Sequence, residues 1–310
     1  MRVAYEVAKE SLPQYAHRFS PKKFTQAQLF ACLILKTWLR RDYRGTSAFL
    51  ADTPELCNAI EMTHVPHFTT LQKASDRLLR SASVKKVLNA TVARIMGPRR
   101  RVRTAAADSS GFDVTYASRY YVWRAKRMRF PQKYLTYRRF PKLGVICDTR
   151  NHVILAAMPT RGPTPDVHQL ADLLAGLVDH PTLVRMIADA GYDSEANHRL
   201  LREDHGIQSI IPAGIGRPTS SLPTGRYRRL MKQRFARRTY RHRSQVETVI
   251  SMLKRNLDGC VRSRGYWSQA RELPLKVITH NVMILLFGKE VFYRAHWSLL
   301  LRRPDRDAGN

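Results

Sequence analysis

The order of apolar segments between residues 104 and 213 is the feature that most limits the folds open to this chain. Three segments with the pattern of strands come first. Helical and strand patterns then alternate, and a last amphipathic helix is expected at 240–257. This order predicts an α/β core with a mixed sheet and helices packed against it. The expected strands span 104–108, 142–148, 152–160, 183–189 and 208–213.

The first hundred residues have a different pattern, in which short amphipathic helices are separated by glycine and proline. We expect one helix to begin after a cap at Thr25 and another after a cap at Thr69. The pattern predicts a small helical domain over 1–100, and a helix-turn-helix is one compatible arrangement. The basic run 97–103 is then a linker to the α/β domain over 101–310.

Two aspartates stand at the ends of predicted strands. Asp108 ends the first, and Asp189 ends the strand that follows the first core helix. Neighbouring strand ends meet at one edge of an open α/β sheet, where ligands bind. Each aspartate alone is also compatible with a helix cap or a turn. Asp193, four residues beyond Asp189, is a rival that we interpret as belonging to a helix N-cap region.

The predicted helix at 240–257 carries one carboxylate in a stripe of polar side chains. Tyr240, Arg243, Glu247 and Lys254 fall within about 60° of one another at helical spacing. A solvated face with an ion pair is the ordinary interpretation of such a stripe. The adjoining apolar stripe, expected to pack on the sheet, comprises Val246, Val249, Ile250, Leu253 and Leu257.

Together the three carboxylates suggest a metal site. Asp108, Asp189 and Glu247 come from separate segments that the predicted fold brings toward one place. Three such groups can hold two hard divalent cations, Mg²⁺ with Mn²⁺ as a substitute, about 3.5–4 Å apart. Such a pair serves phosphoryl transfer.

The charge balance points to a polyanionic partner. Lys and Arg number 54 against 24 acids, giving a formal net charge of +30. Nucleic acid is the expected partner, because bound cations release counterions from its phosphates. A membrane is not expected, since no run of about 18 apolar residues is present. Four widely spaced cysteines argue against a disulfide framework or a zinc knuckle and favour a reducing cytosol.

The basic residues are concentrated in two stretches beside the candidate acids. An insert at 114–147 has no acid and interleaves cations with aromatic residues, as contact with a nucleic-acid strand requires. An irregular loop with its aromatics in the core would give the same pattern. A second basic run covers 217–243. The predicted DNA contacts outside the polar stripe are Arg124, Lys126, Arg127, Arg129, Arg234, Arg237 and Arg238.

Three motifs in this order resemble a known family. They are DSSGF around Asp108, IADAGYDS around Asp189, and the spacing of Tyr240, Arg243, Glu247 and Lys254. They are similar to insertion-sequence transposases of the DDE type with the Y-R-E-K signature, in the groups called IS-four and IS-five. The resemblance covers 104–287 and extends weakly to the helical part. Only 57 residues separate Asp189 from Glu247, which favours the compact IS-five-like arrangement.

The resemblance implies a ribonuclease-H-like core that cuts and joins double-stranded DNA at terminal inverted repeats and target sites. It further implies a prokaryotic enzyme of the cytoplasm and nucleoid that acts as a homodimer on paired ends. The N-terminal helices would bind the element's ends. Arg243 and Lys254 would hold phosphates, and Tyr240 would donate to a phosphate or stack on a base. Two alternatives stay open: a ribonuclease-H-fold nuclease or resolvase, and a catalytically idle DNA-binding descendant.

Overall fold

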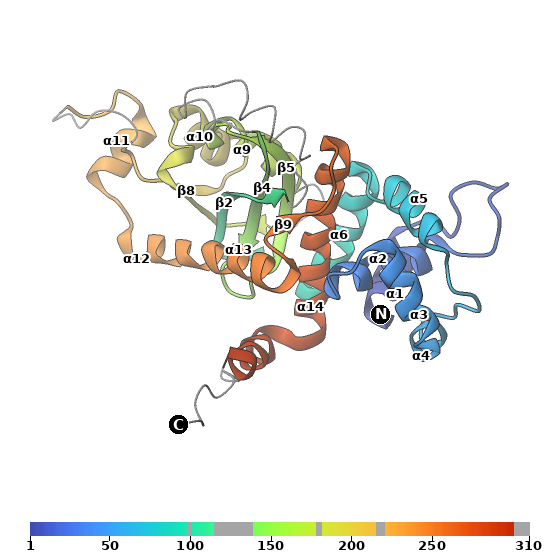
Figure 1. Ribbon diagram of the computed structural model, residues 1–310. Helices are drawn as coiled ribbons and strands as arrows, with labels where there is room; N and C mark the ends of the chain where they lie inside the picture. Colours follow the sequence, from blue (N-terminus) through green and yellow to red (C-terminus); the bar gives the residue numbers. More distant parts are fainter. Residues whose placement is uncertain (98–100, 115–138, 178–181, 215–220, 301–310) are drawn as a thin grey trace, which may run out of the picture.

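The structure is a computed structural model that describes residues 1–97, 101–114, 139–177, 182–214 and 221–300. A mixed sheet lies on one side of the molecule and a group of helices on the other. The long helix α14 (Tyr266–Leu300) runs between them (Figure 1).

The core sheet has five strands in the order β5-β4-β2-β7-β8. The pairs β5–β4 and β4–β2 are antiparallel, whereas β2–β7 and β7–β8 are parallel. The predicted mixed sheet is therefore confirmed. Its strands are β2 (Ala105–Gly111), β4 (Phe140–Asp148), β5 (Ile154–Gly162), β7 (Arg185–Ala188) and β8 (Gln208–Ile210).

The centre of the sheet is built from small residues. Ala105, Ala106 and Ala107 of β2 are fully buried, so the helices on either face can approach the strand closely. Ala107 pairs with Ala188 across the parallel β2–β7 ladder. Asp189 directly follows β7, as predicted, whereas the prediction that Asp108 ends its strand is wrong, because β2 continues to Gly111. The two aspartates still follow neighbouring positions of the sheet.

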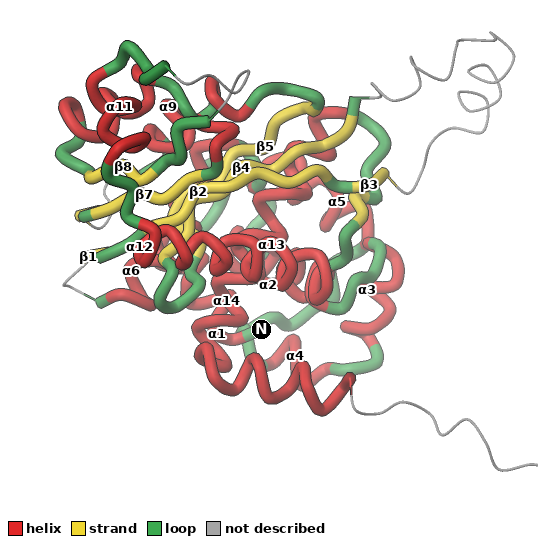
Figure 2. The backbone as a smooth tube through the Cα atoms, turned by 90° about the vertical axis from the view of Figure 1, so that its left-hand side faces the viewer, coloured by secondary structure: helices red, strands yellow, loops and turns green. Residues whose placement is uncertain are grey.

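Helix α13 (Ser244–Leu257) packs against β2 and β4 and also contacts α14 and α2 (Figure 2). It buries Val246, Val249 and Leu253. The prediction of one continuous helix over 240–257 is wrong. Helix α12 (Arg237–Tyr240) ends at Tyr240, and a 3₁₀ turn over Arg241–Arg243 separates it from α13. Tight 3₁₀ turns are common at helix termini, and this one redirects the chain just before the sheet-packing helix.

Other helices of the core are shorter than the sequence predicts. The helix expected after β5 becomes a 3₁₀ turn over Asp166–His168 followed by α9 (Leu170–Ala175). The next becomes α10 (Glu195–Arg199), continued as a π-helical turn over Leu200–Asp204. Helix α11 (Arg226–Gln233) follows in the basic run.

The N-terminal residues are helical, as predicted. Thr25 caps α2 in a capping box with Gln28, which confirms that start. The prediction of a cap at Thr69 is wrong, because α5 begins at Phe68 and the His67 ring accepts from the Thr69 amide. These helices are α1 (Arg2–Ser11), α2 (Gln26–Trp38), α3 (Tyr43–Ala51), α4 (Pro54–Asn58), α5 (Phe68–Leu78) and α6 (Ser81–Met96).

The helical part and the sheet share one hydrophobic core. Helix α6 packs on both α14 and β5. The buried amide of Asn281 on α14 donates to Thr91 Oγ1 of α6 at 3.0 Å and to the Ile154 carbonyl of β5 at 2.9 Å. The division into 1–100 and 101–310 stays a prediction, because buried residues of both parts pack together.

Two short ladders complete the topology. Strand β1 (Arg101–Val102) pairs with β6 (Thr182–Leu183), so the end of the predicted linker is an ordered strand with Val102 buried. Strand β3 (Asp113–Val114) pairs with β9 (Cys260–Val261), next to α13. The four cysteines are free thiols. Within the described ranges, no helix has both the length and the apolar character needed to cross a lipid bilayer.

Candidate active site

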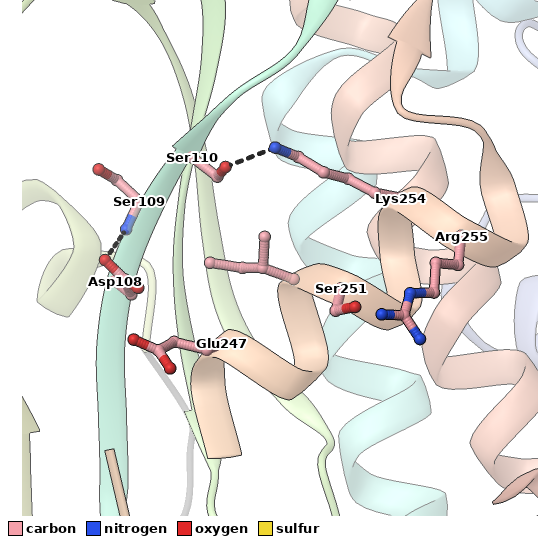
Figure 3. A pocket seen from close by; sticks show the side chains of 8 residues that line it. Asp108, Ser109, Ser110, Glu247, Ser251, Lys254 and Arg255 are labelled. Atoms are coloured by element: carbon pink, nitrogen blue, oxygen red, sulfur yellow. Dashed lines mark hydrogen bonds between the residues drawn. The ribbon is translucent and has the colours of Figure 1, made fainter. Parts of the chain in front are cut away.

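The sheet and α13 bring the three predicted carboxylates to one guanidinium. Arg243 Nη1 lies 2.8 Å from Glu247 Oε1, and Arg243 Nη2 lies 3.2 Å from Asp189 Oδ2 and 3.8 Å from Asp108 Oδ2. Asp108 and Glu247 face one another across the space between β2 and α13 (Figure 3). The 3₁₀ turn before α13 places Arg243 at this junction.

The acids differ in their exposure to water. The Asp108 side chain is 17% exposed, compared with 47% for Asp189 and 55% for Glu247. Burial raises the pKa of Asp108, and the negative charges of Asp189 and Asp166 raise it further. The Ser109 amide and Arg243 oppose the change. Burial lowers the pKa of the Arg243 guanidinium, but the neighbouring carboxylates, Asp189 first, raise it by more. The positive charge of the guanidinium therefore offsets the negative charges of the three carboxylates that the fold brings together here.

A cleft of about 460 Å³ continues from the acids along α13. Lys254 reaches across it and donates to Ser110 Oγ at 2.8 Å (Figure 3). Its ammonium group also lies 5.3 Å from the centre of the Phe112 ring. The cleft thus has an acidic end and a basic end. Its lining residues are Asp108, Ser109, Ser110, Glu247, Ile250, Ser251, Lys254 and Arg255.

Tyr240 is the last residue of α12 and precedes Arg243 by three positions. Its ring packs against Phe235 with centroids 4.9 Å apart. Burial raises the pKa of the Tyr240 phenol. Arg243 opposes this, and the charges of Asp189, Glu247 and Asp108 add to it. Arg243, Glu247 and Lys254 of the predicted polar stripe therefore lie at one site, whose charges also act on Tyr240, although the chain between Tyr240 and Glu247 is not one α-helix.

Asp193, the rival ligand, is held elsewhere. Its side chain is fully buried, and Arg228 Nε and Nη2 donate to it at 2.8–3.0 Å. His198 Nε2 lies 3.7 Å from Asp193 Oδ1. Burial opposes ionisation, but the nearby His198 ring and the hydrogen bonds from Arg228 outweigh it, so the pKa of Asp193 is lowered. Ser194, rather than Asp193, caps α10. The Arg228 pair joins α11 to the core.

We predict that Arg228→Ala destabilises the fold by about 3 kcal/mol, because it leaves a buried carboxylate without its partner. Urea unfolding monitored by circular dichroism measures this free energy. Asp193 has a lowered pKa, so its contribution is present above the ordinary value of 3.8 and is lost as the pH falls through the folded value. The difference between the two proteins should therefore shrink below about pH 4. Arg229→Ala on the same helix is the control, and an equal loss there would contradict the assignment.

A fourth carboxylate was not singled out from the sequence. Asp166 Oδ1 accepts a hydrogen bond from Ser109 Oγ at 2.7 Å and lies 2.6 Å from Lys142 Nζ. Asp166 lies in a segment that the sequence predicts to be helical. Its partners Ser109 and Lys142 are 57 and 24 residues earlier in the chain, so no local sequence pattern indicates these contacts. Its only sequence signal is an acid in a chain with few of them.

Only some of the arginines and lysines predicted to contact the DNA backbone lie in the described part of the chain. Arg234, Arg237 and Arg238 are exposed around α11 and α12, on the chain leading directly into the site. The first residues of the basic run, 217–220, lie outside the described residues. The same holds for Arg124, Lys126, Arg127 and Arg129, which fall within 115–138.

In the described part of the chain, no three His, Cys, Asp or Glu side chains stand ready to hold a metal ion. At the candidate site all three carboxylates contact the Arg243 guanidinium instead. The donor set itself suits a hard divalent cation, since all its ligand atoms are carboxylate oxygens.

Comparison with known proteins gives one family match. The family model described as "Transposase DDE domain" matches residues 101–282, more than half of the chain. No curated protein matches. Among solved structures, the chain is similar to a piggyBac transposase in a cryo-EM synaptic complex with hairpin DNA. The two are 11% identical, the match covers 98% of this chain and 73% of that one, and the TM-score is 0.42. On the family match, this chain belongs to the proteins with a transposase DDE domain.

Proposed function

We propose that this DDE transposase cuts DNA at the terminal inverted repeats of an insertion sequence and joins the ends to target DNA. Asp108, Asp189 and Glu247 are its catalytic carboxylates in this proposal. One observation carries it: the three side chains reach a single guanidinium from β2, from the end of β7 and from α13.

The finer family assignment rests on the polar stripe of Tyr240, Arg243, Glu247 and Lys254. We place the chain in the Y-R-E-K branch, in its compact IS-five-like form, because Arg243, Glu247 and Lys254 lie at one site whose charges also act on Tyr240. The sheet supports a ribonuclease-H-like core, since three antiparallel strands are followed by two parallel ones with the aspartates on adjacent strands.

The carboxylates suit two Mg²⁺ ions, for which Mn²⁺ would substitute. Asp108 and Asp189 would share one ion, and Glu247 would complete the surroundings of the second. Bound divalent cations activate an attacking oxygen and stabilise the leaving oxygen in phosphoryl transfer. Lys254, at the basic end of the cleft, would hold a phosphate beside the cleaved bond, and Tyr240 would donate to a phosphate or stack on a displaced base.

Arg243 has to leave the three carboxylates before they can bind metal ions in this proposal. A guanidinium and a divalent cation would compete for the same oxygens, and a DNA phosphate offers Arg243 another bidentate partner. We therefore propose that Arg243 neutralises the acids in the free protein and turns to a phosphate when DNA is bound.

Arg243→Gln should increase the affinity of the DNA-free protein for Mn²⁺ by about tenfold. The substitution removes a competing cation whose partly exposed ion pairs together are worth roughly 1–2 kcal/mol. Titration calorimetry measures the change. Arg241→Gln, an exposed arginine of the same turn, serves as the control. Weaker Mn²⁺ binding by Arg243→Gln would instead mean that Arg243 helps to hold the site together.

The partner is double-stranded DNA in this proposal, gripped mainly by the cationic surface. A homodimer would act on paired ends, because two sites are needed to process two ends. The N-terminal helices would contribute sequence preference. A prokaryotic cytoplasm, with the enzyme at the nucleoid, is the compartment that this reaction implies.

Replacing Arg234, Arg237 and Arg238 with Gln should weaken binding to all DNA sequences alike. Each phosphate contact that is lost reduces the slope of log K against log salt by about one. Fluorescence anisotropy at several salt concentrations, with an end sequence and a scrambled one, measures both effects. A loss confined to the end sequence would show that these arginines read sequence.

A strand-transfer assay tests the proposed function against its alternatives. Purified protein, Mg²⁺, a DNA end bearing a free 3′-hydroxyl and a target plasmid should give joined products. Cleavage without joining would favour a nuclease or resolvase. Binding without either reaction would favour an idle descendant.

A further inference from the structure

Asp166 connects parts of the site that are far apart in the sequence. It opens the 3₁₀ turn that follows β5 and is neither in the polar stripe nor at a strand end. On one side it contacts β2 and β4, because Ser109 Oγ donates to its Oδ1 at 2.7 Å and Lys142 Nζ lies 2.6 Å from the same atom. Ser109 directly follows Asp108.

The lysine fixes this arrangement. Lys142 pairs with Gly111 in the β2–β4 ladder, and its ammonium group also donates to the Thr164 carbonyl at 2.8 Å. Its side chain is 11% exposed and that of Asp166 25%. The partners of Asp166 are thus a lysine and a serine, both at Oδ1, whereas the three candidate catalytic acids share Arg243.

On its other side the same turn meets the segment that follows Asp189. A Cβ placed on Gly191 would lie 3.8 Å from Asp166 Oδ2, so the turn packs closely here. The largely buried Asn197 amide donates to the Val167 carbonyl at 2.9 Å and to the Tyr192 carbonyl at 2.8 Å. The turn over Asp166–His168 is therefore attached both to the strand of Asp108 and to the turn after Asp189.

We propose that Asp166 is a positioning residue that holds Asp108 and Asp189 at a fixed separation, acting through Ser109 and the turn over Ala190–Tyr192. This role rests on the proposed function of those two aspartates. Packing on the Gly191 side and the hydrogen bond on the Ser109 side make Asp166 the common support of both.

Two measurements test this role: hydrogen exchange of peptides spanning 105–111 and 189–193, and Mn²⁺ affinity without DNA. Asp166→Asn should speed exchange in both peptides and weaken Mn²⁺ binding, each by about tenfold, because a charge-assisted hydrogen bond is lost. Ser109→Ala, a milder change, should speed exchange in 105–111 only. In the double variant with Asp166→Asn and Ser109→Ala, hydrogen exchange of peptide 105–111 should be no faster than in Asp166→Asn alone. Asp172→Asn, exposed on α9, is the matched control.

The two readouts separate this role from the proposed function. Normal exchange of both peptides in Asp166→Asn would overturn the positioning role, as would additive effects of the two substitutions. If the predicted exchange changes appear but the wild-type protein binds no Mn²⁺, Asp166 supports the two aspartates as proposed and the metal site itself is wrong.

Discussion

Asp108→Asn, Asp189→Asn and Glu247→Gln are each expected to abolish DNA cleavage, with a loss of about a thousandfold or more, while DNA binding persists. Each substitution removes an anionic ligand from a site that needs all three. The cationic surface supplies most of the binding energy, so affinity should change little. Gel assays of cleavage and anisotropy of the same DNA measure the two effects separately.

Asp193→Asn is the informative comparison. Its carboxylate pairs with Arg228, so the variant should lose stability yet still cut DNA at temperatures where it is folded. If Asp189→Asn cuts normally and Asp193→Asn does not, the second ligand has been assigned to the wrong residue.

Removal of divalent cations should have an effect of the same size. Cleavage is expected to stop in excess chelator and to return with added Mg²⁺ or Mn²⁺, because the donor set contains only hard oxygen ligands. DNA binding measured in parallel should persist in chelator, since it depends on Lys and Arg. Undiminished cleavage in chelator would exclude a mechanism with bound cations.

The sequence predicted the parts of the fold that rest on periodic patterns. Strand β4 buries eight of its nine residues and β7 three of its four, and the order of the strand patterns led to the mixed sheet. The same order placed Asp108 and Asp189 at the ends of neighbouring strands. The pairing of Ala107 with Ala188 confirms that the strands are neighbours, although β2 continues beyond Asp108 to Gly111. The apolar face of α13 was predicted from the sequence as well, because its buried residues recur at helical spacing.

The parts that were missed depend on contacts between distant residues or on the geometry of single turns. A continuous helical pattern at 240–257 conceals the 3₁₀ turn at Arg241–Arg243, because both helix types use similar residues. Helical spacing made Arg243 a neighbour of Glu247, but only the folded sheet puts its guanidinium beside Asp108 and Asp189 as well. The links of Asp166 to Ser109 and Lys142 likewise exist only after β2, β4 and β5 have paired.

Crystals of the protein soaked in Mn²⁺ provide the most direct measurement of the central claim, because anomalous diffraction locates the ion. The account predicts a peak bound by Asp108 and Asp189, with Glu247 nearby and the Arg243 guanidinium moved away from them. A saturating soak that leaves Arg243 among the three carboxylates, with Mn²⁺ bound elsewhere or not at all, would contradict it.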